Sequence, residues 1–181
     1  DYLYREIDQV ATRFAAKKQL LQLHWGGGTP THLTIPQMQG VWDKLKGVFT
    51  FAADAEIAIE VDPRVTTSEQ LHFLRGLGFN RLSMGVQDLS PEVQEAIGRN
   101  QTDKQTETIY RLGRELGFTG INMDLIYGLP RQNLRDWEKS IATVADWKPD
   151  RLAVYSYAHV PWVKPQQMQI NEAELTKGPE K

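Results

Sequence analysis

The chain has 181 residues, 40% of them hydrophobic, which is enough to bury the core of one domain. Its 21 basic and 23 acidic residues nearly cancel, which excludes the strong basic field of a protein that binds nucleic acid or an anionic membrane surface. There is no cysteine, so this chain has neither disulfides nor thiolate-held metals.

No apolar run approaches the ~20 residues that a membrane span requires. The first six residues also lack the charged and apolar regions of a signal peptide. We therefore expect a soluble, cytoplasmic protein whose partner is a small molecule.

The chain opens with apolar residues at helical spacing, namely Leu3, Ile7, Val10 and Phe14, which predict a helix from residue 1 to about residue 18. No convincing capping residue precedes this helix, so we interpret the sequence as one that was cut within it. A series of βα units follows, in which a short apolar run leads through a loop to an amphipathic segment. The predicted strands are residues 20–25, 56–61, 81–86, 121–126 and 151–157.

Helices are predicted between these strands. They run from Thr34 to Leu45, over residues 68–74 with Ser68 as the cap, briefly from Ser90, and over residues 136–147. Two helix exits have nearly the same sequence, Leu-Gly-Phe at residues 77–79 and at residues 116–118. In each, glycine ends the helix and the following Phe is expected to pack back on it.

Consecutive βα units predict an α/β fold with a parallel sheet and helices outside it. The strands form either a partial barrel of the TIM type or an open doubly wound sheet. A dinucleotide-binding doubly wound domain normally carries G-x-G-x-x-G after its first strand, and this chain does not, so the partial barrel is favoured. Residues 1–163 are predicted to form the barrel core. Residues 164–181, rich in Gln, Glu and Lys, are predicted to form a crossing segment or a loose tail.

Barrel enzymes build their chemistry at the C-terminal ends of the strands, and polar residues follow every predicted strand here. The glycines after the first strand form either a tight turn or a loop whose N–H groups a ligand approaches. Glu60 and Asp124 lie in apolar strands and need partners, which are either Arg81 or Arg99, or the hydroxyls and amine of a ligand. Gln87 either satisfies nearby loop amides or contacts a ligand.

His24 and His159 are the histidines at these strand ends, and we interpret them as packing residues. A metal hydrolase would need several more His and carboxylate ligands at the mouth of the barrel. No metal site is therefore predicted in this chain.

Four strand-end segments, taken together and in this order, closely resemble the oxygen-independent coproporphyrinogen III oxidases. The segments are His-Trp-Gly-Gly-Gly-Thr-Pro (24–30), Glu-Val-Asp-Pro-Arg (60–64), Gly-Phe-Asn-Arg-Leu-Ser-Met-Gly-Val-Gln-Asp (78–88) and Asp-Leu-Ile-Tyr-Gly-Leu-Pro (124–130). The resemblance runs from the first helix to about Leu175. It implies a radical S-adenosylmethionine enzyme with a (β/α)6 partial barrel, of which this chain carries the second to sixth strands.

In the family, a loop after the first strand carries a Cys-x-x-x-Cys-x-x-Cys motif that holds a [4Fe-4S] cluster. Because this chain has no cysteine, we interpret it as a truncated form that does not hold the cluster and is inactive alone.

The family's contacts with S-adenosylmethionine carry over to eight positions. Gly27, Gly28 and Thr29 match the glycine motif that meets the amino end of the cofactor. Four further residues match polar cofactor contacts, and one matches a backbone contact near the adenine; these are Glu60, Gln87, Arg99, Asp124 and Ala158. No catalytic residue is assigned.

The resemblance implies oxidative decarboxylation of coproporphyrinogen III to protoporphyrinogen IX without oxygen, as a step of haem biosynthesis. In the family, an electron from the cluster cleaves S-adenosylmethionine, and the 5′-deoxyadenosyl radical removes hydrogen from a propionate. The implied partners are the porphyrinogen and an electron donor, and the full-length protein is expected to be a monomer. The alternative is a haem-binding chaperone of the same superfamily, whose relatives usually carry Asn-Pro-Gly in place of Asp62-Pro63-Arg64 and Ser in place of Asp88.

Overall fold

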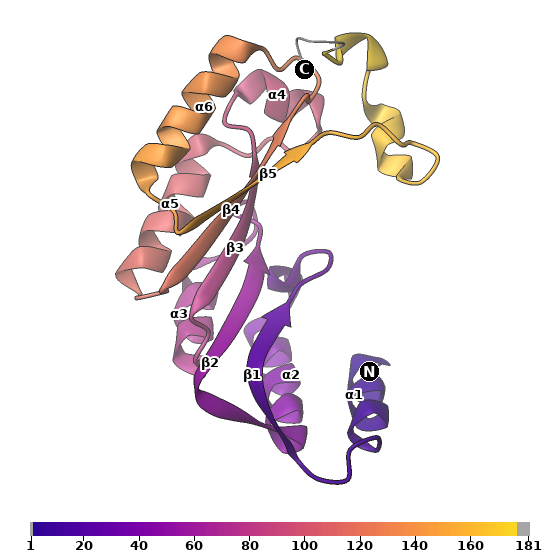
Figure 1. The fold of residues 1–181 in the computed structure, drawn as a ribbon, viewed down its shortest axis with the longest axis vertical. Coiled ribbons are helices and arrows are strands. Elements are labelled where there is room, and N and C mark those ends of the chain that lie inside the picture. The colour runs from indigo at the N-terminus through magenta and orange to yellow at the C-terminus, as the bar shows by residue number, and fades with distance from the viewer. Residues whose placement is uncertain (1, 177–181) are drawn as a thin grey trace.

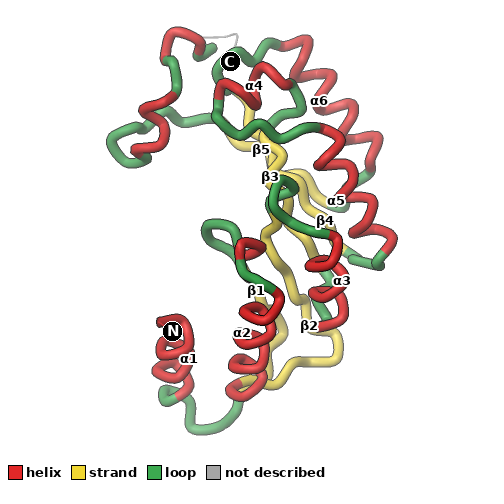
Figure 2. Tube along the Cα trace, turned by 180° about the vertical axis from the view of Figure 1, so that it is seen from behind, coloured by secondary structure: helices red, strands yellow, loops and turns green. Residues whose placement is uncertain are grey.

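The computed structural model describes residues 2–176, which form a curled five-stranded sheet with helices along its outer face (Figures 1 and 2). The strands are β1 (Lys18–Trp25), β2 (Phe49–Val61), β3 (Arg81–Gln87), β4 (Gly120–Tyr127) and β5 (Arg151–Ser156). The α-helices are α1 (Tyr2–Ala11), α2 (Ile35–Val48), α3 (Ser68–Leu77), α4 (Pro91–Ala96), α5 (Asp103–Glu115) and α6 (Leu134–Trp147). Three short 3-10 helices are η1 (Pro30–His32), η2 (Pro165–Gln169) and η3 (Glu172–Glu174).

The strands lie in the order β1-β2-β3-β4-β5, and every neighbouring pair is parallel. The predicted α/β fold with five parallel strands is therefore confirmed. The sheet is open between its two edge strands, so it forms a half-barrel with a concave inner face (Figure 1). All five C-terminal strand ends lie at one end of this face, because parallel strands run in the same direction.

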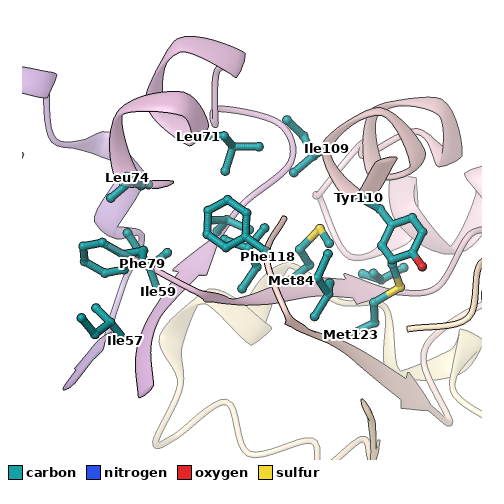
Figure 3. Packing of buried hydrophobic residues seen from close by; sticks show 14 of the residues in the cluster. Ile57, Ile59, Leu71, Leu74, Phe79, Met84, Ile109, Tyr110, Phe118 and Met123 are labelled. Atoms are coloured by element: carbon teal, nitrogen blue, oxygen red, sulfur yellow. The ribbon is translucent and has the colours of Figure 1, made fainter. Parts of the chain in front are cut away.

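Buried and half-buried residues alternate along the central strands, so the two faces of the sheet differ in burial. Leu82, Met84 and Val86 of β3 are buried toward the helices, whereas the residues between them are only half-buried on the concave face. In β4 the buried positions are Ile121, Met123 and Leu125. The core therefore lies between sheet and helices (Figure 3), and the concave face is left for polar groups.

The N-terminal part differs most from the prediction. Helix α1 ends at Ala11, and of the four apolar residues that suggested it only Ile7 is buried. Phe14 lies beyond the helix, where its ring packs edge-on against Phe49 at 6.0 Å. Strand β2 begins at residue 49 rather than 56, because its first residues alternate aromatic and polar side chains and Phe51 stacks on Trp42 at 5.0 Å.

The starts of α2, α3, α4 and α6 agree with the prediction to within two residues, whereas no start was predicted for α5. Thr34 caps α2 with a reciprocal bond to Gln37, whereas α3 is capped by Thr67 and not by Ser68. Asn133 caps α6, so this helix starts at residue 134 instead of 136.

Both Leu-Gly-Phe exits are confirmed. Gly78 and Gly117 have φ values of 105° and 79°, and Phe79 and Phe118 are buried.

After β5 the chain turns back across the end of the sheet as the segment 161–176. Glu174 there accepts hydrogen bonds from the Arg131 guanidinium and, through its carbonyl, from the Arg131 N–H at 3.0 Å. These contacts hold residue 174 against the loop after β4, while 177–181, the end of the segment predicted to be a crossing segment or a loose tail, lie outside the described residues. The proposed boundary at residue 163 stays a prediction. Among residues 2–176, no helix has the length and apolar character needed to cross a membrane.

Candidate functional site

The C-terminal ends of the first four strands enclose a pocket of about 200 Å³ on the concave face. Its lining mixes two glycines with carboxylates, an arginine and smaller polar groups: Gly28, Thr29, Glu60, Val61, Asp62, Ser83, Gly85, Gln87, Arg99 and Asp124. Six of the eight predicted cofactor-binding residues therefore lie around one space. This volume is below the roughly 300 Å³ at which pockets for whole small-molecule ligands begin, so it suits one end of a larger ligand lying along the open sheet.

The glycine loop after β1 is tied to Glu60 of β2. The Gly27 N–H donates to Glu60 Oε2 at 3.1 Å, and His24 Nε2 lies 3.2 Å from Glu60 Oε1. A Cβ on Gly26 would come within 2.7 Å of Glu60 Oε1 and of His24 Nε2, so a side chain there would displace both groups. Gly27 and Gly28 have φ values of 81° and 62°, with open space where their Cβ atoms would be. The loop is thus both a tight turn and a backbone surface that a ligand can approach.

Asp124 carries the second carboxylate of the pocket. Its Oδ1 accepts a hydrogen bond from Asn122 Nδ2 at 2.7 Å. Burial raises the pKa of Asp124; the bond from Asn122 lowers it and the negative charge of Glu60 raises it, leaving the pKa above its ordinary value. A cationic group or a pair of hydroxyls between these carboxylates would relieve their repulsion.

The arginine partners suggested for these carboxylates were wrong. Arg81 pairs with Glu56, which lies on the same strand as Glu60 but four residues earlier and outside the pocket. Arg99 lies 3.6 Å from Asp62 instead. Within residues 2–176, Glu60 and Asp124 therefore have no arginine partner, although each has the hydrogen bonds described above.

Arg99 reaches the pocket from the loop after α4. Its Nη2 donates to the Gly85 carbonyl at 2.8 Å, and its Nε donates to Gln101 Oε1 at 2.9 Å. Burial lowers the pKa of Arg99, with nearby Arg64 acting in the same direction and Asp62 opposing both. The guanidinium is thus held at the wall by fixed contacts.

Gln87 closes β3 in a conformation unusual for a residue with a side chain, with φ of 68°. The pairing of β3 with β4 shifts register between Gly85 and Gln87, and such irregularities re-aim a side chain at the end of a strand. A Cβ on Gly85 would lie 2.7 Å from Gln87 Nε2 and 3.2 Å from Arg99 Nη2. Glycine at residue 85 therefore makes the space that these two side chains occupy.

Two predicted site residues do not line the pocket. Gly27 contributes indirectly through its bond to Glu60. Ala158 is exposed beyond β5, and its carbonyl accepts a hydrogen bond from Gln167 Nε2 at 3.1 Å. The packing interpretation of His159 agrees with the structure, since its ring lies between the Tyr157 hydroxyl at 3.0 Å and Glu172 at 3.1 Å.

Four lining residues were missed as site residues, namely Val61, Asp62, Ser83 and Gly85. The signal was present, because all four stand in strand-end segments already marked as polar. Within residues 2–176, no three His, Asp or Glu side chains gather as a metal ion would require.

The sequence profile of the family described as "Radical SAM superfamily" matches residues 2–144. The chain belongs to this superfamily. It is 45% identical over 181 residues to the oxygen-independent coproporphyrinogen III oxidase of Escherichia coli (strain K12), covering all of this chain and 39% of that protein. It is 39% identical over 177 residues to the enzyme of the same name from Synechocystis, covering 98% of this chain and 38% of that protein. The chain thus spans about two-fifths of the length of the curated relatives it matches.

Solved structures agree with the fold. The Escherichia coli coproporphyrinogen III oxidase, described as a radical SAM enzyme, superposes with a TM-score of 0.94 at 45% identity, over 99% of this chain and 41% of that one. The archaeal Elp3 of Methanocaldococcus infernus superposes with a TM-score of 0.64 at 15% identity, over 91% of this chain and 44% of that one, which bears on the fold alone. The predicted partial barrel of the radical S-adenosylmethionine type is confirmed.

Proposed function

We propose that the pocket at the ends of β1 to β4 binds S-adenosylmethionine, and that the intact protein is an oxygen-independent coproporphyrinogen III oxidase. One observation carries the binding proposal: six residues matched to the family's cofactor contacts line the same pocket, five of them from four separate strand-end segments and Arg99 from the loop after α4. The identity of 45% to an oxidase over the whole chain supports the choice of reaction.

The residues fit the cofactor in charge and shape. Glu60 and Asp124 offer two carboxylates without an arginine partner among residues 2–176, and the raised pKa of Asp124 supports a ligand that brings positive charge or hydroxyl donors to this end of the pocket. The glycine loop leaves backbone open to a ligand, and Arg99 supplies a fixed cation at another wall. A sulfonium nucleoside with a ribose, an ammonium and a carboxylate has complementary groups for all three.

When bound, S-adenosylmethionine would supply the radical that removes a hydrogen from a propionate of the substrate. The part of this chain is to bind and orient. Glu60 and Asp124 would accept hydrogen bonds from the ligand. Gly28 and Thr29 would lie against one end of it. Gln87 at the end of β3 and Arg99 in the loop after α4 would donate hydrogen bonds to it. Fixed contacts suit radical chemistry, because a misplaced reactive carbon would meet other hydrogen donors.

The remaining parts of the proposal concern the intact protein. The [4Fe-4S] cluster, whose ligands are not among the residues of this cysteine-free chain, the electron donor, coproporphyrinogen III, a monomeric state and a cytoplasmic location are all inferred from the resemblance to the oxidases. Ala158 is retained as a proposed backbone contact to the adenine, because a carbonyl that accepts one bond from Gln167 still has a second lone pair.

The binding proposal is tested by isothermal titration of the intact protein with S-adenosylmethionine, with the cluster reconstituted anaerobically. Glu60→Gln and Asp124→Asn are each expected to raise Kd by about tenfold, since a hydrogen bond to a charged group contributes roughly 1.5–3 kcal/mol. The matched control is Asp54→Asn, which removes an exposed carboxylate in the middle of β2, outside the pocket, and should leave Kd unchanged. Equal affinities for all four proteins would refute the assignment of this pocket.

The reaction is tested by anaerobic turnover of coproporphyrinogen III, with protoporphyrinogen IX as the product. Tight stoichiometric haem binding by the intact protein, with no turnover of coproporphyrinogen III, would instead identify the haem-binding chaperone. Asp62 and Asp88 stand at positions where the chaperone pattern usually carries Asn and Ser, and this supports the oxidase.

A further inference from the structure

Asp62 is a pocket residue whose carboxylate is engaged almost entirely by one neighbour. Its side chain is 9% exposed, and both of its oxygens accept hydrogen bonds from Arg64, with Nε at 3.0 and 3.1 Å and Nη2 at 2.6 Å. The Arg64 N–H also donates to Asp62 Oδ1 at 3.0 Å. A forked pair reinforced by a backbone bond holds both side chains in one geometry.

Arg64 also connects this pair to Arg99. Its Nη1 donates to the Arg99 backbone carbonyl at 2.8 Å, while Asp62 Oδ2 lies 3.6 Å from Arg99 Nη2. Residues 62–64 thus hold the backbone of Arg99 at one point and attract its guanidinium at another. These contacts come from the loop after β2, 35 residues away along the chain.

The Arg99 guanidinium has further N–H groups that these contacts do not use. Its Nε is used by Gln101 and one N–H of Nη2 by Gly85, but its Nη1 has no hydrogen-bond partner among residues 2–176. Arginine has five N–H groups in a rigid fork, so fixing Nε and Nη2 also fixes the direction of Nη1.

Burial makes this arrangement necessary. The Arg99 side chain is only 19% exposed, and a guanidinium so far from water needs a nearby negative charge. Asp62 supplies that charge without taking up Nη1. Arg64 in turn orients Asp62, and it compensates the charge of a carboxylate that is itself buried. Burial raises the pKa of Asp62, but the bonds from Arg64 and the charge of Arg99 outweigh it, so the pKa lies below its ordinary value and Asp62 is ionised at neutral pH.

We propose that Asp62 and Arg64 are positioning residues, which hold the Arg99 guanidinium so that its Nη1 is presented to S-adenosylmethionine. The inference rests on the proposed function of the pocket and deepens it. Neither Asp62 nor Arg64 is required to touch the cofactor. Their effect on binding passes through Arg99.

The test is a double-mutant cycle in the intact, reconstituted protein, with Kd for S-adenosylmethionine as the readout. Asp62→Asn and Arg99→Gln are each expected to raise Kd by about tenfold. In the Arg99→Gln background, adding Asp62→Asn should change Kd by less than about twofold, because the group that Asp62 orients is gone. A merely structural role for Asp62 would instead give effects that multiply.

Arg64→Lys provides a second, independent arm. Lysine keeps the positive charge but cannot donate to both carboxylate oxygens and the Arg99 carbonyl together. It should raise Kd as Asp62→Asn does in the wild-type background, and have no effect in the Arg99→Gln background. Because Arg64 lies at the surface, this variant remains informative if Asp62→Asn fails to fold.

Glu56→Gln is the matched control, since it breaks another carboxylate–arginine pair of the same sheet, the one with Arg81, outside the pocket. Its Kd should equal that of the wild type. If Glu60→Gln and Asp124→Asn weaken binding while the Asp62, Arg64 and Arg99 variants do not, the positioning role is refuted and the proposed function stands. Multiplying effects in the cycle also refute the positioning role. An intact protein without affinity for S-adenosylmethionine overturns both proposals.

Discussion

Gly113 lies where α5 packs against the sheet. Replacing it by alanine changes the free energy of unfolding in two ways, through helix propensity and through packing in the core. A Cβ at this position would lie 2.9 Å from Leu82 Cδ1 and 3.1 Å from Ile121 Cδ1. Both neighbours are core residues, 2% and 0% exposed, so neither can swing into solvent. Gly76 is also helical, near the end of α3, but it is exposed and has nothing within 4 Å of its would-be Cβ.

The two substitutions should change stability in opposite directions. Alanine in place of glycine in a helix contributes about 0.5–1 kcal/mol to the free energy of unfolding. Gly76→Ala should show this gain alone. At Gly113 the added methyl group overpacks the core, which costs about 1–3 kcal/mol and exceeds the gain. We therefore expect Gly113→Ala to destabilise by about 1 kcal/mol, which is about 2 kcal/mol less stable than Gly76→Ala.

Native-state hydrogen exchange of the β3 and β4 amides in the intact protein measures this difference, because it reports the opening of these strands rather than of other segments. The opening free energy should fall for Gly113→Ala and hold or rise for Gly76→Ala. A stabilised Gly113→Ala would show that α5 is not packed as closely on Leu82 and Ile121 as the structure has it.

Two further substitutions test polar groups near the strand ends. The raised pKa of Asp124 favours its protonated form in the folded protein, so its contribution to stability is present below the ordinary aspartate pKa and is lost as pH rises through the folded-state pKa. Asp124→Asn should therefore stabilise the ligand-free protein relative to wild type at neutral pH but not at acidic pH. Denaturant titrations that show the opposite trend would contradict burial as the cause of the raised pKa of Asp124. Asp88 is fully buried and accepts hydrogen bonds at 2.8 Å from both the Ser90 N–H and the Ser140 hydroxyl. Asp88→Ala should therefore lower the free energy of unfolding, measured with urea, by about 3 kcal/mol. Asp146→Ala, which removes an exposed carboxylate of α6, should change it little.

The positions of the central strands were predicted well from the sequence because the burial of their apolar side chains determines where these strands form. The central strands carry unbroken apolar alternation, and the Leu-Gly-Phe exits have a single conformational solution. The prediction failed at the N-terminal end, where α1 packs only Ile7 and the start of β2 depends on Trp42 meeting Phe51. A stacking partner on another element leaves no local pattern.

The site was predicted at the level of which strand ends matter, since parallel strands must bring those ends together. The pairing between side chains was not predictable in the same way. An arginine was one of the two partners considered for Glu60, which instead bonds His24 and the Gly27 N–H. Asp62 was passed over because its role depends on Arg99, a residue from a different loop. Charge and spacing identify candidates, whereas the choice among nearby cations is made by loop geometry.

The alternation along β3 and β4 has a consequence for how this half-barrel can change. Leu82, Met84 and Met123 face the helices and decide whether the sheet forms, whereas Ser83 and Asn122 lie on the opposite face, where Asn122 bonds Ser83 and Asp124 of the pocket. A library that randomises the second set leaves the first intact, so variants with new ligand preferences should still fold. In these two strands, the residues that can change ligand preference are therefore different from the residues on which folding depends.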